Sequence, residues 1–225
     1  MDAYNQRTPS DRPRFSVAEE RAHYLSHALG IALSVPAVAL LIRLAAPRSA
    51  GTFIGCSVYG VTLVLMYLAS TAYHAVPFRS RRTKQVLRML DHSAIFLLIC
   101  GTYTPLALAV LRDTTGYLLL GAVWALCGVG LVLTARRKPQ RGGPILLYLA
   151  MGWAVAPALP ALSRALGNQA LLLFFLGGAF YTLGVPFYVW RRLRYHHAVW
   201  HGFVLLGSAF HFLAMMIFVV PYSGG

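Results

Sequence analysis

Residues 51–76, GTFIGCSVYGVTLVLMYLASTAYHAV, contain no aspartate, glutamate, lysine or arginine. An α-helix needs about 20 mostly apolar residues to cross the ~30 Å hydrocarbon core of a bilayer. Only helices and closed barrels satisfy their backbone hydrogen bonds inside lipid, and this run is too long for a barrel strand. The stretch therefore predicts a transmembrane helix.

Six further stretches of similar length and composition lie on either side of this one. They are residues 24–42, 89–111, 117–135, 144–163, 169–190 and 197–221. The whole chain of 225 residues is 58% apolar and 12% charged, whereas a soluble domain has about 25% charged residues. The sequence predicts an all-α integral membrane bundle of seven transmembrane helices, in one domain from residue 23 to 225. Residues 1–22 are polar and are expected to form a cytoplasmic N-terminal tail without a cleaved signal peptide.

The basic residues are unevenly distributed between the two ends of the predicted bundle. Four segments on one side hold sixteen of the twenty: Arg7, Arg12, Arg14, Arg21, Arg79, Arg81, Arg82, Lys84, Arg88, Arg136, Arg137, Lys138, Arg141, Arg191, Arg192 and Arg194. The other side holds Arg43, Arg48, Arg112 and Arg164. Because cytoplasmic loops carry the excess of lysine and arginine, we expect the N-terminus in the cytoplasm and the C-terminus outside.

The formal charge of +14 is then explained by membrane topology. We expect membrane lipids as partners, because arginines at the cytoplasmic surface meet anionic headgroups, and we expect no nucleic acid. The chain is expected to cross its membrane several times. The sequence gives no prediction of the oligomeric state.

Polar residues inside the apolar stretches are candidates for function, because ionisable groups at membrane depth are costly. Ser70 and His74 end the second stretch, Asp91 begins the third, and His197 and His201 begin the seventh. In the predicted orientation all of these positions lie at the cytoplasmic end. His197 and His201 share one helix face because they are four residues apart. Together with an imidazole from a facing helix they would suit zinc, with a fourth position open for water.

Asp91 has no partner at metal-binding spacing, so we interpret it as a hydrogen-bond acceptor for the metal-bound water or a ligating imidazole. It is the only one of the six carboxylates that we expect beside the histidine cluster. Ser70 has an alternative role in helix packing, as serine often has in membranes. The cysteines Cys56, Cys100 and Cys127 form no CxxC pair and are expected to be buried free thiols.

The remaining histidines favour structural roles. His23, His92 and His196 are expected to reach the membrane interface or to bond to backbone groups. His211 lies ten residues beyond His201, about 15 Å along a helix that rises ~1.5 Å per residue. We therefore expect it to bond to a neighbouring helix rather than to the same metal.

Four segments carry a resemblance to a known family. They are EERAHYLSHALG (19–30), STAYH (70–74), LDHSAIFLLICGTYTP (90–105) and HAVWHGFVLLGSAFHF (197–212). They resemble the hemolysin III family, the bacterial branch of the progestin and adipoQ receptor superfamily, and the likeness covers nearly the whole chain from Glu19. The resemblance implies zinc as cofactor, held by His74, His197 and His201. It also implies that the protein lies in the bacterial inner (plasma) membrane.

The resemblance also implies that Asp91 lies near the zinc with water between them, and that Ser70 lies close by. Glu19, Glu20 and His27 match the N-terminal motif of the family. His23 departs from it, because relatives commonly have asparagine at this position. The extra imidazoles at the start of the first stretch leave room for a fourth protein ligand.

Three functions are compatible with these features. The resemblance implies a zinc-dependent hydrolase of a lipid amide or ester, in which Asp91 accepts a proton and Ser70 helps to hold the oxyanion. A second hypothesis is a membrane sensor or regulator in which zinc is structural. A third is the cytolytic activity from which the family takes its name.

Overall fold

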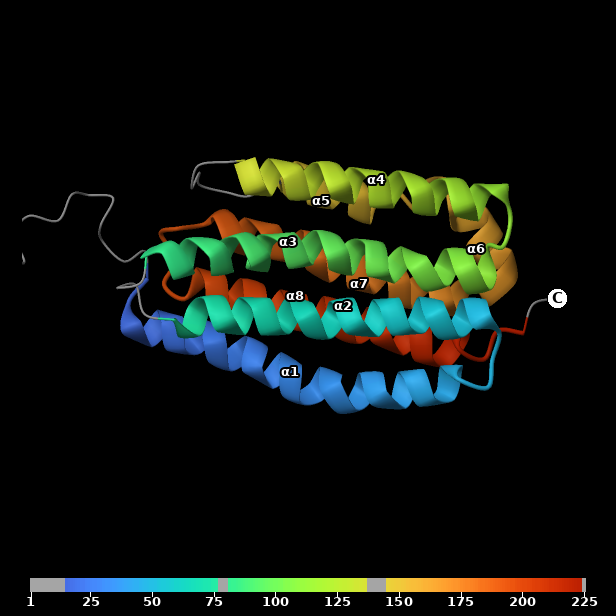
Figure 1. Cartoon of the computed structure of the whole chain (residues 1–225), viewed down its shortest axis with the longest axis horizontal. Helices are drawn as coiled ribbons and strands as arrows, with labels where there is room; N and C mark the ends of the chain where they lie inside the picture. Colours follow the sequence, from blue (N-terminus) through green and yellow to red (C-terminus); the bar gives the residue numbers. More distant parts are fainter. Residues whose placement is uncertain (1–14, 77–80, 137–144, 224–225) are drawn as a thin grey trace, which may run out of the picture.

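The computed structural model describes residues 15–76, 81–136 and 145–223. Its long elements are α1 (Val17–Ala45), α2 (Ala50–Ala75), α3 (Arg81–Pro105), α4 (Thr114–Arg136), α5 (Ile145–Gly152), α6 (Leu159–Leu166), α7 (Asn168–Val189) and α8 (His196–Ala214). Short π-helical or 3₁₀ turns lie at Leu106–Val110, Ala156–Ala158 and Met215–Val219. Within these ranges the regular structure is entirely helical (Figure 1).

In the described part of the chain, seven helical spans are long and apolar enough to cross a membrane, which confirms the predicted all-α membrane bundle. The fifth span is not one continuous helix, because α5, a 3₁₀ turn and α6 follow one another from residue 145 to 166. Pro157 lies in the 3₁₀ turn and Pro160 in the first turn of α6. Proline has no N–H and clashes with the preceding turn, which explains the interruption.

The first helix begins at Val17, inside the stretch that was expected to be a tail. Ser16 caps the helix: its side chain accepts from the Glu19 N–H, and the Glu19 side chain accepts from the Ser16 N–H. Such a capping box, with Glu19 and Glu20 near the positive end of the helix dipole, stabilises a polar first turn. Glu20 is consequently fixed on the same helix as His23 and His27.

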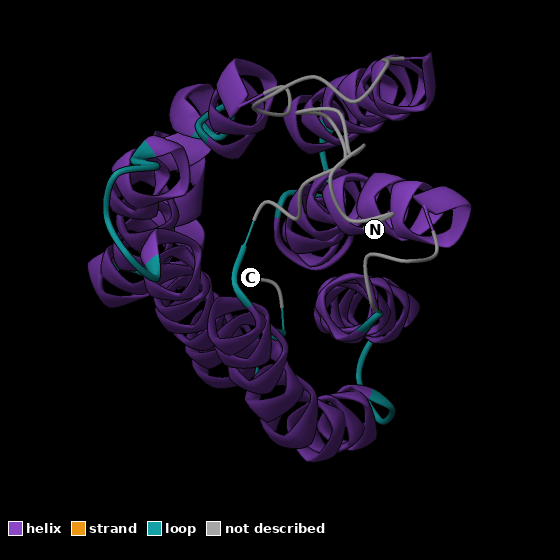
Figure 2. Cartoon of the chain, turned by 90° about the vertical axis from the view of Figure 1, so that its left-hand side faces the viewer, coloured by secondary structure: helices purple, strands orange, loops and turns teal. Residues whose placement is uncertain are grey.

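The helices run along the long axis of the molecule, and consecutive spans lie side by side (Figures 1 and 2). α2 packs between α1 and α3, α4 packs on α3, and α8 contacts both α7 and α1. The starts of α1, α3 and α8 and the end of α2 meet at one end of the bundle, on the left in Figure 1. This arrangement brings together the histidines that are far apart in sequence.

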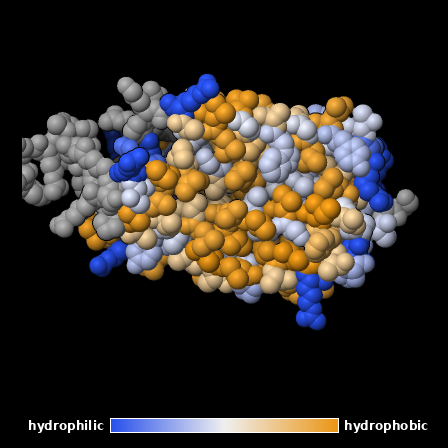
Figure 3. Space-filling view, in the orientation of Figure 1, coloured by the Kyte–Doolittle hydropathy of each residue, from blue (hydrophilic) through white to orange (hydrophobic). Residues whose placement is uncertain are grey.

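The surface between the two ends is largely apolar, whereas hydrophilic residues gather at the ends (Figure 3). Arg7, Arg12, Arg14, Arg79, Arg137, Lys138 and Arg141 lie outside the described residues. The described N-terminal and C-terminal segments lie at opposite ends, as an odd number of spans requires (Figure 1). That the end with the histidines faces the cytoplasm stays a prediction.

The packing of α2 on α3 depends on glycine. A Cβ atom at Gly101 would collide with the side chain of Thr62 on α2. We expect Gly101→Ala to lower the free energy of unfolding by about 1–3 kcal/mol, the usual cost of overpacking. The measurement is thermal unfolding of the purified protein in detergent.

Gly128→Ala on α4 is the matched control, because a Cβ there meets no atom within 4 Å. Gly128→Ala adds the same methyl group as Gly101→Ala and raises the helix propensity by the same amount. Equal melting temperatures for the two variants would show that the Gly101 contact does not limit the packing of α2 on α3.

Candidate metal centre

Three histidines from two helices converge at the end of the bundle where α1, α3 and α8 begin. His74 lies in the last turn of α2, and His197 and His201 lie in the first turns of α8. One ring nitrogen from each lies within 4.8 Å of those of the other two, and all three residues are buried. The ring centroids are 5.1 Å apart for His74 and His197, 5.3 Å for His74 and His201, and 4.6 Å for His197 and His201.

The hydrogen bonds leave a free nitrogen on His74. Its Nδ1 donates to Oε2 of Glu20 at 2.6 Å, and its Nε2 is buried without a hydrogen-bond partner among the described residues. Buried polar atoms nearly always have a partner, so the His74 Nε2 atom is available to bind a metal ion. A carboxylate behind an imidazole is also the usual support of a metal-bound histidine.

His201 is oriented in a similar way. Its Nδ1 lies 3.1 Å from the carbonyl oxygen of His23 and 2.8 Å from Oγ of Ser26. A carbonyl only accepts, so Nδ1 carries the proton and Nε2 keeps its lone pair. Three buried imidazoles with at least two of them oriented in this way fit a zinc ion, which binds histidine nitrogen at ~2.0–2.1 Å.

Glu20 is a carboxylate beside the cluster, so the expectation that Asp91 would be the only one was wrong. Glu20 accepts from Lys84 Nζ at 3.3 Å through its Oε1. Lys84 in turn donates to the carbonyl oxygens of Tyr73 at 2.6 Å and Val76 at 3.0 Å. The error arose because α1 begins earlier than expected. The spacing of Glu20, His23 and His27 at i, i+3 and i+7 was the available signal, since these positions share a helix face.

His23 also differs from its expected role. It is 0% exposed, and neither of its ring nitrogens has a hydrogen-bond partner among the described residues. The two ring nitrogens of His27 also lack a hydrogen-bond partner among the described residues. The His27 ring stacks on that of His201, with 3.6 Å between the ring centroids. Five imidazoles, from His23, His27, His74, His197 and His201, thus form one contiguous cluster.

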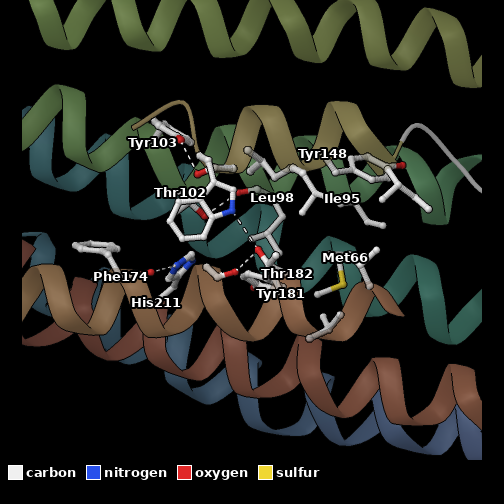
Figure 4. A pocket seen from close by; sticks show the side chains of 18 of the residues that line it. Met66, Ile95, Leu98, Thr102, Tyr103, Tyr148, Phe174, Tyr181, Thr182 and His211 are labelled. Atoms are coloured by element: carbon white, nitrogen blue, oxygen red, sulfur yellow. Dashed lines mark hydrogen bonds between the residues drawn. The ribbon is translucent and has the colours of Figure 1, made fainter. Parts of the chain in front are cut away.

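The other histidines bond to backbone carbonyls, as predicted. His92 contacts the oxygen of Arg88 at 2.9 Å and His196 that of Phe187 at 2.9 Å. His211 contacts the carbonyl oxygen of Phe174 on α7 at 3.0 Å, a bond drawn in Figure 4. The three cysteines are buried and free, which was also predicted.

Ser70 and Asp91 share a cavity of about 210 Å³ with His27, His197 and His201. Oδ2 of Asp91 lies 3.6 Å from Nδ1 of His92. The cavity extends along the bundle, and its wall is mostly apolar. Figure 4 shows part of this wall, with Met66, Ile95, Leu98, Thr102, Tyr103, Tyr148, Phe174, Tyr181, Thr182 and His211. A polar end with imidazole, hydroxyl and carboxylate groups thus opens into an apolar chamber.

The role of Glu20 can be tested by removing its charge. We expect Glu20→Gln to weaken metal binding about 10–100-fold, the usual effect of losing the acceptor behind a ligating imidazole. Titration of the purified protein against a chromophoric zinc chelator measures this change. Glu19→Gln is the control, because Glu19 serves the cap at Ser16 and glutamine keeps a capping box. Equal zinc affinities for both variants would contradict the role of Glu20.

A seven-helix membrane protein with buried imidazoles from its second and last spans is the class that this fold and cluster define. The sequence model of the family described as Haemolysin-III related matches residues 15–212. The chain belongs to this family.

The curated relatives span the whole length of the fold. The chain is 40% identical over 211 residues to a "Hemolysin-3 homolog" of Bacillus subtilis, which covers 92% of this chain and 97% of the relative. It is 37% identical to "Hemolysin-3" of Bacillus cereus, over 91% of this chain and 94% of the relative. The human "Monocyte to macrophage differentiation factor" is 27% identical, over 94% and 89% respectively.

Proposed function

We propose that this protein is a zinc-dependent hydrolase that cleaves an amide or ester bond of a membrane lipid, in the bacterial inner membrane. The observation that carries this proposal is the shared cavity, whose wall includes Asp91, Ser70 and three histidines of the cluster, His27, His197 and His201. When bound by His74, His197 and His201, zinc would polarise the lipid carbonyl and lower the pKa of water to roughly 7.

The two candidate catalytic residues have complementary chemistry. The Asp91 carboxylate accepts the proton of the attacking water and later returns it to the leaving group. The Ser70 hydroxyl donates a hydrogen bond to the carbonyl oxygen, where negative charge develops. Both residues lie in the cavity wall together with His197 and His201, which supports a common position for the substrate carbonyl.

The shape and polarity of the cavity favour a lipid substrate. Its apolar walls, with Met66, Leu98 and Phe174 among them, match an acyl chain and offer few partners to water. Pockets of this kind bind mostly through apolar contact, and a few polar groups fix the orientation of the ligand. The acyl chain would occupy the chamber while the scissile carbonyl lies at the polar end.

The test is fatty-acid release by purified protein in lipid nanodiscs. Ceramide and phospholipid substrates are supplied with zinc, and products are measured by mass spectrometry. We expect release that stops on removal of zinc with a chelator and returns on addition of zinc. Fully zinc-loaded protein that releases no fatty acid from any substrate would contradict the proposal.

A structural role for zinc is the second candidate, and the position of the ligands favours it. His74 ends α2 while His197 and His201 begin α8, so a bound ion would join two spans that are far apart in sequence. Metal binding of this kind contributes directly to folding free energy. Cytolysis is suggested by the names of the family and of its two Bacillus relatives, and the apolar cavity favours lipid over the passage of ions.

A further inference from the structure

We propose that His23 is a fourth imidazole ligand of this metal centre and holds the position that water would otherwise occupy. This inference concerns the regulation of the proposed site and rests on its three-histidine core. In the resting protein, four imidazoles would then fill all four coordination positions of the metal. His23 must dissociate from the metal before a substrate can be cleaved.

The first observation is that, among the described residues, His23 has no hydrogen-bond partner. The residue is fully buried, and both Nδ1 and Nε2 lack a hydrogen bond among the described residues. The nearest carboxylate oxygen, Oε2 of Glu20, is 3.7 Å from Nδ1, which is too long for a hydrogen bond. Leaving a buried polar group without a hydrogen bond costs about 1–3 kcal/mol. An imidazole in this state is therefore a candidate for binding a metal ion.

The second observation is the spacing of the rings. The centroid of His23 lies 4.7 Å from that of His74, 4.9 Å from that of His197 and 5.7 Å from that of His201. Four imidazoles around one tetrahedral zinc, each at ~2.1 Å, place neighbouring ring centroids about 5 Å apart. The distances of His23 to His74 and His197 match this spacing, whereas its distance to His201 is longer. The group of three histidines whose ligand atoms all lie within 4.8 Å of one another does not include His23, so the closed centre requires a small shift of the His23 ring towards His201.

The third observation is that described residues enclose the His23 ring beside the three-histidine group. Phe15 packs edge-on against it at 4.6 Å between centroids. Oε2 of Glu20 lies 3.7 Å from its Nδ1, and Glu20 is itself held by Lys84 at 3.3 Å. The surroundings of His23 thus keep its ring next to His74 and His197.

The chemical consequence follows from coordination number. Zinc with four protein ligands is the arrangement of structural sites, whereas catalytic sites keep one position open. His23 thus makes the centre stable and inactive at rest. Under the proposed function, its removal is expected to weaken metal binding and to increase hydrolysis, two effects that a merely structural histidine would not produce together.

The experiment compares wild-type protein with His23→Asn after both are loaded with cobalt(II), which reports coordination through visible absorption. We expect one metal ion per chain in each protein. The wild-type spectrum should be insensitive to azide, because the fourth position is filled, whereas the spectrum of His23→Asn should shift. Zinc affinity should fall by more than about 10-fold in the variant, because loss of a direct ligand exceeds the smallest effect of losing a hydrogen-bond partner behind a ligand.

His196→Asn is the matched control, because it removes an imidazole whose Nδ1 bonds to the Phe187 carbonyl oxygen. Its azide response and zinc affinity should equal those of the wild type. An azide shift in the wild-type spectrum would overturn the proposal even if His23→Asn failed to fold.

Two metal ions per wild-type chain, falling to one in His23→Asn, would also overturn it. In that case a second ion is held by Glu20, His23 and His74, whose ligand atoms likewise lie within 4.8 Å of one another. Absence of metal from the wild type would defeat this proposal and the metal-dependent function together. The wild-type cobalt spectrum could be insensitive to azide while neither the wild type nor His23→Asn releases fatty acid. That result would contradict the proposed hydrolase function but not the role of His23 as a ligand.

Discussion

Asp91→Asn is expected to lower fatty-acid release about 10²–10⁴-fold, which is the usual contribution of a positioned general base. Asparagine keeps the size and polarity of the side chain but cannot accept the proton of the attacking water. Asp91 is absent from the group of three histidines that could hold the ion, so the metal content should stay unchanged. Rates in nanodiscs and zinc content by mass spectrometry measure the two quantities on the same samples.

Asp113→Asn is the control for this substitution. Asp113 accepts from the Gly116 N–H at 2.8 Å near the start of α4, and asparagine is an equally good cap. Since Asp113 precedes α4 at the end of the bundle opposite the histidine cluster, its replacement should leave the rate of release unaltered. If Asp91→Asn released fatty acid at the wild-type rate, the structural role of zinc would become the better account.

The double substitution His197→Ala, His201→Ala is expected to abolish specific metal binding. It leaves only His74 of the three-histidine group, and only His74 and His23 of the four proposed ligands, which is fewer than the three or four protein ligands of zinc sites in proteins. The wild type should gain about 2.7 kcal/mol of stability at a zinc concentration 100 times its Kd, because only the folded state binds. The variant should gain nothing.

Thermal unfolding with and without zinc measures this difference in detergent. His196→Ala provides the comparison, because it truncates the adjacent histidine of α8 but lies outside the three-histidine group. Zinc should still raise its melting temperature. A zinc-dependent rise in the double variant as large as that of the wild type would show that the ion binds elsewhere.

The membrane spans follow from local composition, which is why the sequence alone predicted seven of them. Each span satisfies its own backbone hydrogen bonds, so its existence does not depend on contacts with the others. The ends of the spans were harder to predict. The polar first turn of α1 is stabilised by the cap at Ser16, and this interaction does not appear in an apolar pattern.

For the metal centre too, one part could be predicted from local sequence and another part depends on tertiary packing. His197 and His201 lie on one face of one helix, so their spacing was sufficient to predict that they act together. The contact of His74 with Glu20 joins residues 54 positions apart and requires α1 and α2 to pack in one particular register. The position of Lys84, which was counted only as a cytoplasmic charge, also depends on this packing.

Sequence by itself therefore determined the class of protein, the number of spans and a short set of polar candidates, because hydrophobicity and helical spacing are properties of neighbouring residues. Only the tertiary structure decided which candidates meet. It placed His23 inside the cluster rather than at the membrane interface, and it placed Glu20 behind His74. Both outcomes arise because α1 begins at Val17 and packs between α2 and α8, and no single segment encodes such a contact.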